Sequence, residues 1–197
     1  MPKGFSEREK ALIRAAFSAK GRELFSMHGL AKTNIADLSR AAGVSKGAFY
    51  LFYDSKEALF FDLLEQFEAS YKAAMLQAIA DQQLTPAERM RTLLRDAIAV
   101  LHSAPLFAQF SGEEYERLAR KLPPERLHAH LQADQTFAAE FIATWQSVGV
   151  EIRVSPELLT GLLRALFVLA MHKKDIGSSV HTQVIEASID MLASYLM

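Results

Sequence analysis

The chain has 197 residues, a formal net charge of −1 and no cysteine. A chain of this length forms one large domain or two small ones and buries about 70% of its unfolded surface without cross-links. The lack of cysteine excludes disulfides, thiol catalysis and cysteine-based metal sites. The charged N-terminus is unlike a signal peptide and no apolar run is long enough to span a bilayer, so we expect a cytoplasmic protein with no membrane partner.

The first predicted helix begins after Ser6 and ends at Gly29. Ser6 and Glu9 have the spacing of a capping box, in which each side chain bonds the backbone N–H of the other residue. Gly29 is the type of residue that terminates a helix. Gly21 lies inside this helix, where it costs about 1 kcal/mol of helix propensity, and it indicates close packing against another helix.

Two short helices joined by a glycine turn are predicted next. Asn34 caps the first, Gly43 ends it in the left-handed conformation, and Ser45 caps the second. Lys46 supplies charge at the start of the second helix, and Gly47 leaves room there for a phosphate or a base edge. The pattern predicts a helix-turn-helix whose second helix enters the DNA major groove; an ordinary helical hairpin with a glycine C-cap is the alternative.

The residues on both sides extend this pattern, with Leu24-Phe25 before it and Tyr50-Leu51-Phe52-Tyr53 after it. From about residue 6 to residue 65 the chain resembles the DNA-binding domain of the TetR (tetracycline repressor) family of bacterial regulators. The resemblance implies that eight residues face DNA: Thr33, Ser45, Lys46, Gly47, Ala48, Tyr50, Leu51 and Lys56.

Within that set, Lys46, Tyr50 and Lys56 are expected to contact phosphates, which set register and salt dependence. Gly47, Ala48 and Leu51 are expected to face base edges, where Ala48 and Leu51 can meet thymine methyl groups. Many relatives have Thr and His at the positions of Ala48 and Leu51. Fewer polar base readers are therefore left, and DNA shape carries more of the specificity.

Charge and helix pattern divide the chain into two parts. Residues 1–60 carry ten basic and six acidic residues, a net charge of +4, whereas residues 61–197 carry a net charge of −5. A basic N-terminal part, residues 1–60 (the head), and an acidic remainder, residues 61–197 (the body), suit a protein that presents one end to DNA. We expect an all-α fold of about nine helices, with a DNA-binding domain at residues 1–54 and an effector-binding and dimerisation domain at residues 55–197.

The body helices are expected at five places. A helix capped by Asp54 runs to about residue 80, a second opens at Thr85-Pro86, and a broken segment follows around residues 105–123. Long helices then cover residues 124–148, 156–174 and 180–197. The helix at 156–174 is apolar on nearly every face, so it needs a partner on both sides, and a second copy of the chain is the simplest one.

The resemblance also implies dimerisation through the last two long helices. The expected interface residues are Leu159, Leu162, Leu166, Leu169, Val184, Ile185, Ile189 and Leu192. A central helix in a large monomer is the alternative. The candidate residues for an apolar or aromatic effector are His102, Phe107, Phe110, Asp134, Phe137, Phe141, Trp145, Arg164, Phe167 and Met171. Because buried charges are usually paired, Asp134 and Arg164 are expected to pair with each other or to orient the effector.

No catalytic or nucleotide-binding motif is found, and His128 and His130 point to different faces of a helix, so we expect no enzyme activity, no cofactor and no metal. The expected function is a ligand-responsive transcriptional regulator. It would bind a pseudo-palindromic double-stranded DNA operator as a homodimer, act as a repressor, and be released by a small-molecule effector. The alternative is a helical small-molecule-binding or partner-binding protein whose DNA-binding head is inactive.

Overall fold

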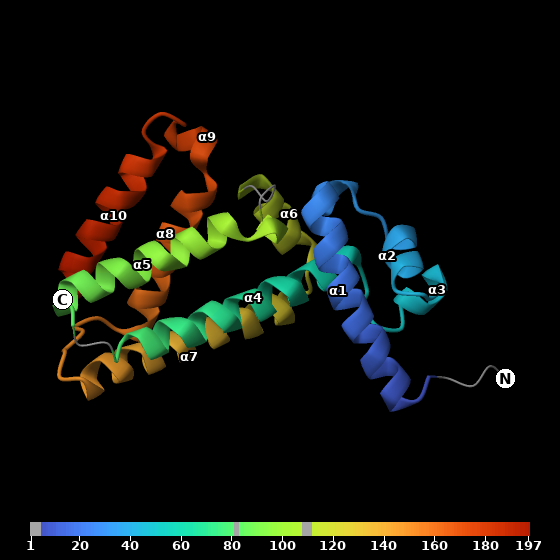
Figure 1. Ribbon diagram of the computed structural model, residues 1–197, viewed down its shortest axis with the longest axis horizontal. Coiled ribbons are helices and arrows are strands. Elements are labelled where there is room, and N and C mark those ends of the chain that lie inside the picture. Colours follow the sequence, from blue (N-terminus) through green and yellow to red (C-terminus); the bar gives the residue numbers. More distant parts are fainter. Residues whose placement is uncertain (1–4, 81–82, 108–111) are drawn as a thin grey trace. The chain divides into compact units, whose positions relative to one another are not determined.

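The computed structural model describes residues 5–80, 83–107 and 112–197. These residues form ten α-helices and one short 3-10 helix and contain no strand, as the all-α prediction requires (Figure 1). The chain divides into two compact units. One comprises the described residues of Met1–Phe67 and Ala104–Leu122, and the other comprises Glu68–Ser103 and Pro123–Met197. This division falls inside α4 (Lys56–Ala78), whereas the functional boundary expected after residue 54 remains a prediction.

The first unit contains α1 (Glu7–Lys32), α2 (Ile35–Ala41), α3 (Lys46–Phe49), the start of α4, η1 (Pro105–Phe107) and α6 (Gly112–Lys121). The predicted capping box is present, because the Ser6 N–H donates to Glu9 Oε2 at 2.7 Å and the Glu9 N–H donates to Ser6 Oγ at 3.3 Å. Gly29 breaks α1 with a φ of 73°, and one further turn ends at Lys32. Figure 1 shows α2 and α3 beside the C-terminal part of α1.

Gly21 is buried at the contact between α1 and α4. A Cβ atom at this position would lie 3.3 Å from Leu59 Cδ2 and 3.3 Å from Leu63 Cδ1. Phe25, one turn further along α1, packs edge-to-face on Phe60 at 5.2 Å between ring centroids. The close helix packing predicted from Gly21 is therefore confirmed.

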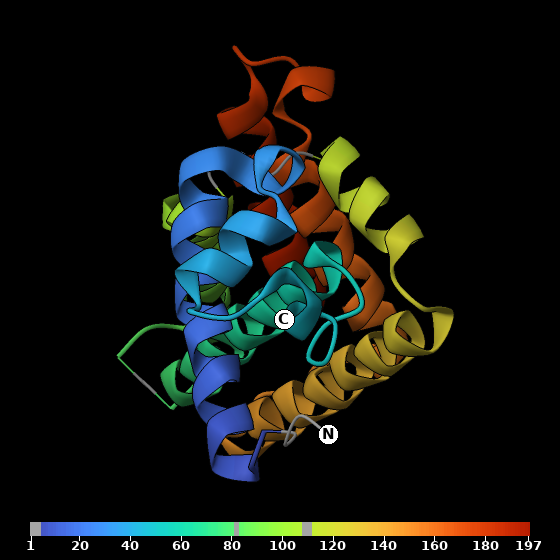
Figure 2. The same ribbon diagram turned by 90° about the vertical axis from the view of Figure 1, so that its right-hand side faces the viewer.

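The second unit contains the rest of α4, α5 (Pro86–Ser103), α7 (Pro124–Ser147), α8 (Pro156–Met171), α9 (Lys173–Ile176) and α10 (His181–Leu196). Helix α8 contacts both α7 and α10, and α10 contacts α5 (Figure 2). Phe141, Trp145, Leu159 and Ile189 are fully buried in this unit. None of the helices in the described part of the chain is both long and apolar enough to cross a membrane.

Two predicted helix boundaries are wrong, and two short helices were not predicted. Ser55, rather than Asp54, caps α4, because its Oγ accepts the Ala58 N–H at 3.1 Å. The helix expected to continue to residue 174 ends at Met171, because His172 leaves the helical conformation with a ψ of 43°; α9 follows as a separate turn. The segment expected to be broken contains α6, and these two additional helices raise the number above the nine that were expected.

The first prediction concerns Gly43. Its φ is +74°, and a Cβ atom added to this residue would meet no atom within 4 Å. Gly43→Ala should lower the free energy of unfolding by about 1–2 kcal/mol through backbone strain alone. Urea unfolding of the full chain measures this loss. Gly43→Asn should cost less, since asparagine tolerates the left-handed conformation. Equal losses for Ala and Asn would contradict a backbone cause.

Candidate functional site

The two helices of the predicted helix-turn-helix are held by local bonds on either side of Gly43. Asn34 Oδ1 accepts the Asp37 N–H at 2.9 Å, and Ser45 Oγ accepts the Ala48 N–H at 3.1 Å. The Val44 N–H donates to the Ser39 carbonyl at 2.9 Å and closes the turn. Both predicted N-caps are therefore confirmed, and the start of α3 is fixed relative to α2.

Helix α3 is attached to α1 by aromatic side chains. Phe49 is fully buried, with its ring edge-to-face on Phe17 at 5.2 Å and tilted against Tyr53 at 5.8 Å. Phe52, three residues further on, is half-buried, and its ring centroid lies 5.8 Å from that of Phe17. Burial, followed by the nearby Asp62 carboxylate, raises the pKa of Tyr53 to about 12, so the phenol stays neutral in this core.

The opposite surface of α3 and the turn after it is exposed. Lys46 and Gly47 face solvent, Ala48 is half-buried, and the side chains of Tyr50 and Leu51 are 51% and 70% exposed. A Cβ added to Gly47 would meet only Ser45 Oγ, at 3.9 Å. No internal contact therefore requires glycine at this position, and the open space lies on the exposed surface.

Thr33, expected to face DNA, has its side chain inside the first unit. It is 2% exposed, and its hydroxyl donates to the Gly29 carbonyl at 2.8 Å and to the Leu24 carbonyl at 3.3 Å. The Thr33 N–H also donates to the Gly29 carbonyl, at 3.3 Å, so the hydroxyl and the backbone of Thr33 both bind the end of α1. The Thr33 side chain thus holds the junction between α1 and α2 and is turned away from solvent.

Lys56, also expected to face DNA, binds the same junction from α4. Its Nζ donates to the carbonyl oxygens of Leu30 at 2.7 Å, Ala31 at 3.0 Å and Thr33 at 2.7 Å. All three donor positions of the ammonium group are used. Burial lowers the pKa of Lys56, an effect that the neighbouring Glu57 opposes. The side chain therefore caps α1 rather than projecting as a solvated charge.

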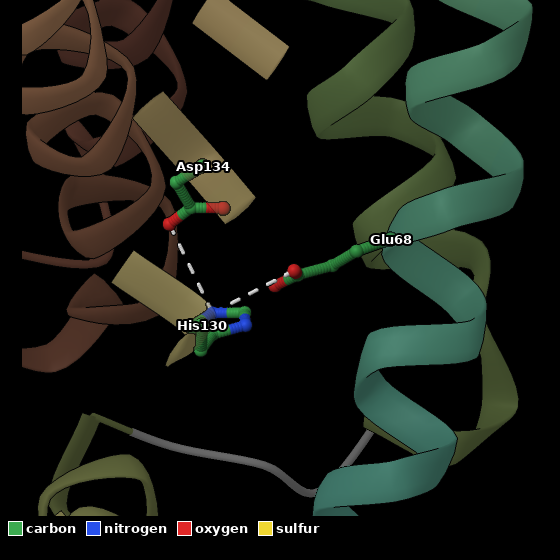
Figure 3. Close-up of side chains that lie close together, drawn as sticks. All are labelled: Glu68, His130 and Asp134. Carbon is green, nitrogen blue, oxygen red and sulfur yellow. Dashed lines mark ion pairs between the residues drawn. The ribbon is translucent and has the colours of Figure 1, made fainter. Parts of the chain in front are cut away.

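The second unit contains a cluster of charged side chains on α4, α7 and α8. Lys72 Nζ donates to Asp134 Oδ1 at 2.6 Å, and Arg164 Nη2 donates to Asp134 Oδ2 at 3.2 Å. The pairing expected for Asp134 and Arg164 is confirmed. Glu68 and His130 complete the cluster, with His130 Nε2 lying 3.7 Å from Glu68 Oε2 (Figure 3). Burial raises the pKa of Glu68, whereas Lys72 and His130 oppose that shift.

The sequence prediction missed Glu68, Lys72 and His130 as members of this cluster. The one available signal was the four-residue spacing of His130 and Asp134, which places both side chains on the same face of a helix. Glu68 and Lys72 share that spacing on α4. Nothing local in the sequence shows that the two pairs meet, because Lys72 and Asp134 are 62 residues apart.

The other candidate effector residues divide into three groups. Phe141 and Trp145 are fully buried, and Phe137 continues their stack along α7 under Lys72 Nζ, which lies 5.4 Å from its ring centroid. Phe167 and Met171 are half-buried, and His102 lies 3.4 Å from the Ala170 carbonyl. The side chain of Phe107 and the whole of Phe110 lie outside what the structure describes.

Most residues of the expected dimer interface are used inside the second unit. Five of them are buried within the chain itself: Leu159, Leu166, Ile185, Ile189 and Leu192. The other three are half-buried: Leu162, Leu169 and Val184. On the same helices, the large apolar side chains left exposed are Leu158, Met191 and Tyr195.

Comparison with known proteins finds a family match in the first unit and more distant relatives over most of the chain. Residues 18–63 match the family model described as bacterial regulatory proteins, tetR family. The chain is similar to the HTH-type transcriptional repressor DhaR of Mycobacterium sp. strain GP1, with 24% identity over 153 residues. That alignment covers 78% of this chain and 77% of DhaR.

Two solved structures share the fold over nearly the whole chain. A TetR-family transcriptional regulator from Pectobacterium atrosepticum has a TM-score of 0.70 at 22% identity, covering 98% of each chain. FadR of Thermus thermophilus, a TetR-family transcriptional repressor in complex with lauroyl-CoA, has a TM-score of 0.68 at 24% identity. That match covers 93% of this chain and 95% of FadR, and at these identities both likenesses are ones of fold.

The second prediction separates stability from surface charge. Lys56→Met keeps the aliphatic stem but removes the donor from three carbonyl groups, so the free energy of unfolding should fall by about 1–3 kcal/mol. Lys46→Met, a matched change at an exposed lysine, should alter it by less than about 0.5 kcal/mol. Denaturant unfolding in the absence of DNA measures both. Unchanged stability of Lys56→Met would instead favour a phosphate contact for this residue.

Proposed function

We propose that this chain, which is similar to the tetR family of bacterial regulatory proteins over residues 18–63 and to the repressor DhaR, is a ligand-responsive transcriptional regulator that represses by binding a pseudo-palindromic operator as a homodimer. One surface carries this proposal. Helix α3 is anchored by the buried Phe49, and together with the turn after it exposes Lys46, Gly47, Tyr50 and Leu51. A rigid, partly basic helix surface of this kind suits entry into a major groove.

The exposed residues have different proposed roles. Lys46 and Tyr50 contact phosphates, which position the helix without reading sequence. Ala48 and Leu51 contact thymine methyl groups, and Gly47 allows close approach of the DNA. Ser45, at the start of α3, is also proposed to contact DNA, while its hydroxyl caps the helix. Thr33 and Lys56, whose polar groups bind the end of α1, act by positioning the helices rather than by direct contact.

The effector is proposed to bind the second unit. The half-buried Phe137, Phe167 and Met171 offer apolar contact, while Arg164, whose side chain is 40% exposed, offers a cation for a polar group. The fold relative FadR, solved with lauroyl-CoA, supports an amphipathic effector with an apolar part. Such an effector must bind more tightly to one of two dimer arrangements that differ in the distance between the two DNA-binding units. The coupling free energy between effector binding and DNA binding is typically about 1–3 kcal/mol.

The homodimer is proposed to form through α8 and α10. Met191 and Tyr195 on α10 and Leu158 on α8 keep large apolar side chains in solvent. Exposed apolar side chains that gather on adjacent helices are typical of protein interfaces. The fully buried residues of the same helices, such as Leu159 and Ile189, support the interface from inside the protomer.

The third prediction tests DNA recognition. Sequences selected from a random library should include a palindrome, and Gly47→Ala should weaken binding to it by at least about tenfold, or 1.4 kcal/mol. Thermal unfolding should show no loss of stability, since alanine favours helix by up to about 1 kcal/mol and the added Cβ meets open space. Lys46→Ala should reduce the slope of log affinity against log salt by about 1.

Two results would contradict the regulator proposal. One is a folded dimer that enriches no sequence over bulk DNA, which would favour a binding protein with an inactive head. The other is Gly47→Ala protein that binds the selected palindrome as tightly as the parent chain.

The fourth prediction tests the dimer. Met191→Glu combined with Tyr195→Glu places two charges where the apolar contact is proposed, so sedimentation should show monomers at concentrations at which the parent chain is dimeric. Leu12→Glu is the matched control, because Leu12 on α1 is 62% exposed, close to the 66% of Met191. This control should remain dimeric. Dissociation of the control, or a dimer that survives the double change, would contradict the assignment to α8 and α10.

A further inference from the structure

We propose that Glu68, His130 and Asp134 form a binding site for a divalent metal ion of the zinc type, a property beyond the regulator function. Each residue offers one ligand atom, and the three atoms lie within 4.8 Å of one another. Figure 3 shows the imidazole of His130 between the two carboxylates, with Glu68 on α4 and the other two residues on α7. The three side chains thus converge before any ion arrives.

The spacing of the ligand atoms matches an ion better than direct hydrogen bonds. His130 Nε2 lies 3.7 Å from Glu68 Oε2 and 3.9 Å from Asp134 Oδ2. Both distances exceed the range of an N–H···O bond, about 2.7–3.2 Å. Zinc bonds to nitrogen and oxygen of about 2.0–2.2 Å place tetrahedral ligands about 3.4 Å apart. The two His130 distances would have to shorten by only a few tenths of an ångström, and the Glu68 and Asp134 oxygens, which lie within 4.8 Å of each other, by up to about 1.4 Å, a change within reach of side-chain rotation.

Two cationic side chains, Lys72 and Arg164, already pair with the carboxylates, and a metal ion can bind beside both. Lys72 Nζ donates to Asp134 Oδ1 at 2.6 Å, which leaves Oδ2 for the ion, and its second contact, with Glu68 Oε2, is long at 3.5 Å. Arg164 lies 3.2 Å from Oδ2, but its side chain is 40% exposed and can turn to solvent. An ion pair with one partner this exposed is weakened by solvent, so the movement of Arg164 away from Asp134 does not prevent metal binding.

The ligand types select the ion. One imidazole and two carboxylates suit Zn²⁺ and Co²⁺, whereas Mg²⁺ prefers six oxygen ligands and retains several waters. Three protein ligands leave a fourth position for water or for a donor atom of an effector. The exposed His128, two residues from His130, has its side chain on a different face of α7 and takes no part.

The test is calorimetric titration of Zn²⁺ into the untagged full chain after chelator treatment and dialysis, with Mg²⁺ as the comparison ion. The chain has no cysteine, so no thiolate site can account for binding. We expect one Zn²⁺ per chain, tetrahedral absorption with Co²⁺, and no measurable Mg²⁺ binding. His130→Ala and Glu68→Gln should weaken Zn²⁺ binding by at least about a hundredfold. His128→Ala, the matched control, should bind like the parent chain.

Circular dichroism melts in chelator establish that each variant is folded, and Asp134→Asn replaces any variant that is not. Absence of Zn²⁺ binding to the folded parent chain would overturn the proposal. Binding retained in both Glu68→Gln and His130→Ala would overturn it as well, because the ion would then lie elsewhere. Neither result affects the DNA-binding proposal, since the titration contains no DNA.

Discussion

The position of α3 depends on the burial of one side chain, Phe49. A helix of four residues has too few internal hydrogen bonds to be stable alone, because nucleation is costly. Contact with Phe17 on α1 and with Tyr53 supplies the tertiary energy that α3 lacks. The ring also fixes the rotation of the helix about its axis. The exposure of Tyr50 and Leu51, on which the proposed DNA recognition rests, follows from that rotation.

Asp134 holds helices together in the second unit as Phe49 does in the first, but it acts through charge rather than through buried apolar area. It lies on α7 and accepts hydrogen bonds from Lys72 on α4 and Arg164 on α8, so one carboxylate joins three helices. Half-buried carboxylates are costly unless they are paired in this way. The same cluster brings His130 and Glu68 together, so a structural pairing has also created a set of ligand atoms.

Local features of the fold could be predicted from the sequence, and long-range features could not. The capping bonds of Ser6, Asn34 and Ser45 span three residues each, so the sequence contains all the information they need. The three carbonyl groups bound by Lys56 lie 23 to 26 residues away. Their position depends on how α1 ends at Gly29 and how α4 packs, which no short pattern encodes.

Residues that share a chemical type therefore cannot be told apart in the sequence where tertiary contacts decide their surroundings. Lys46 and Lys56 look alike in the sequence, yet one is exposed and the other is enclosed by carbonyl groups. The apolar residues of α8 and α10 present the same problem. Periodicity identifies which of them are apolar, whereas the packing of α5 and α7 decides which, such as Ile189, are buried within the protomer and which, such as Met191, remain exposed.

The three bonds from Lys56 have a consequence for genetics. A chain that lacks them still has every proposed DNA contact, so regulation would persist in the cold and fail as the head approaches its unfolding temperature. Substitution at Lys56 should therefore give a temperature-sensitive allele. Substitution at Lys46 should give an allele that is equally weak at every temperature and sensitive instead to ionic strength.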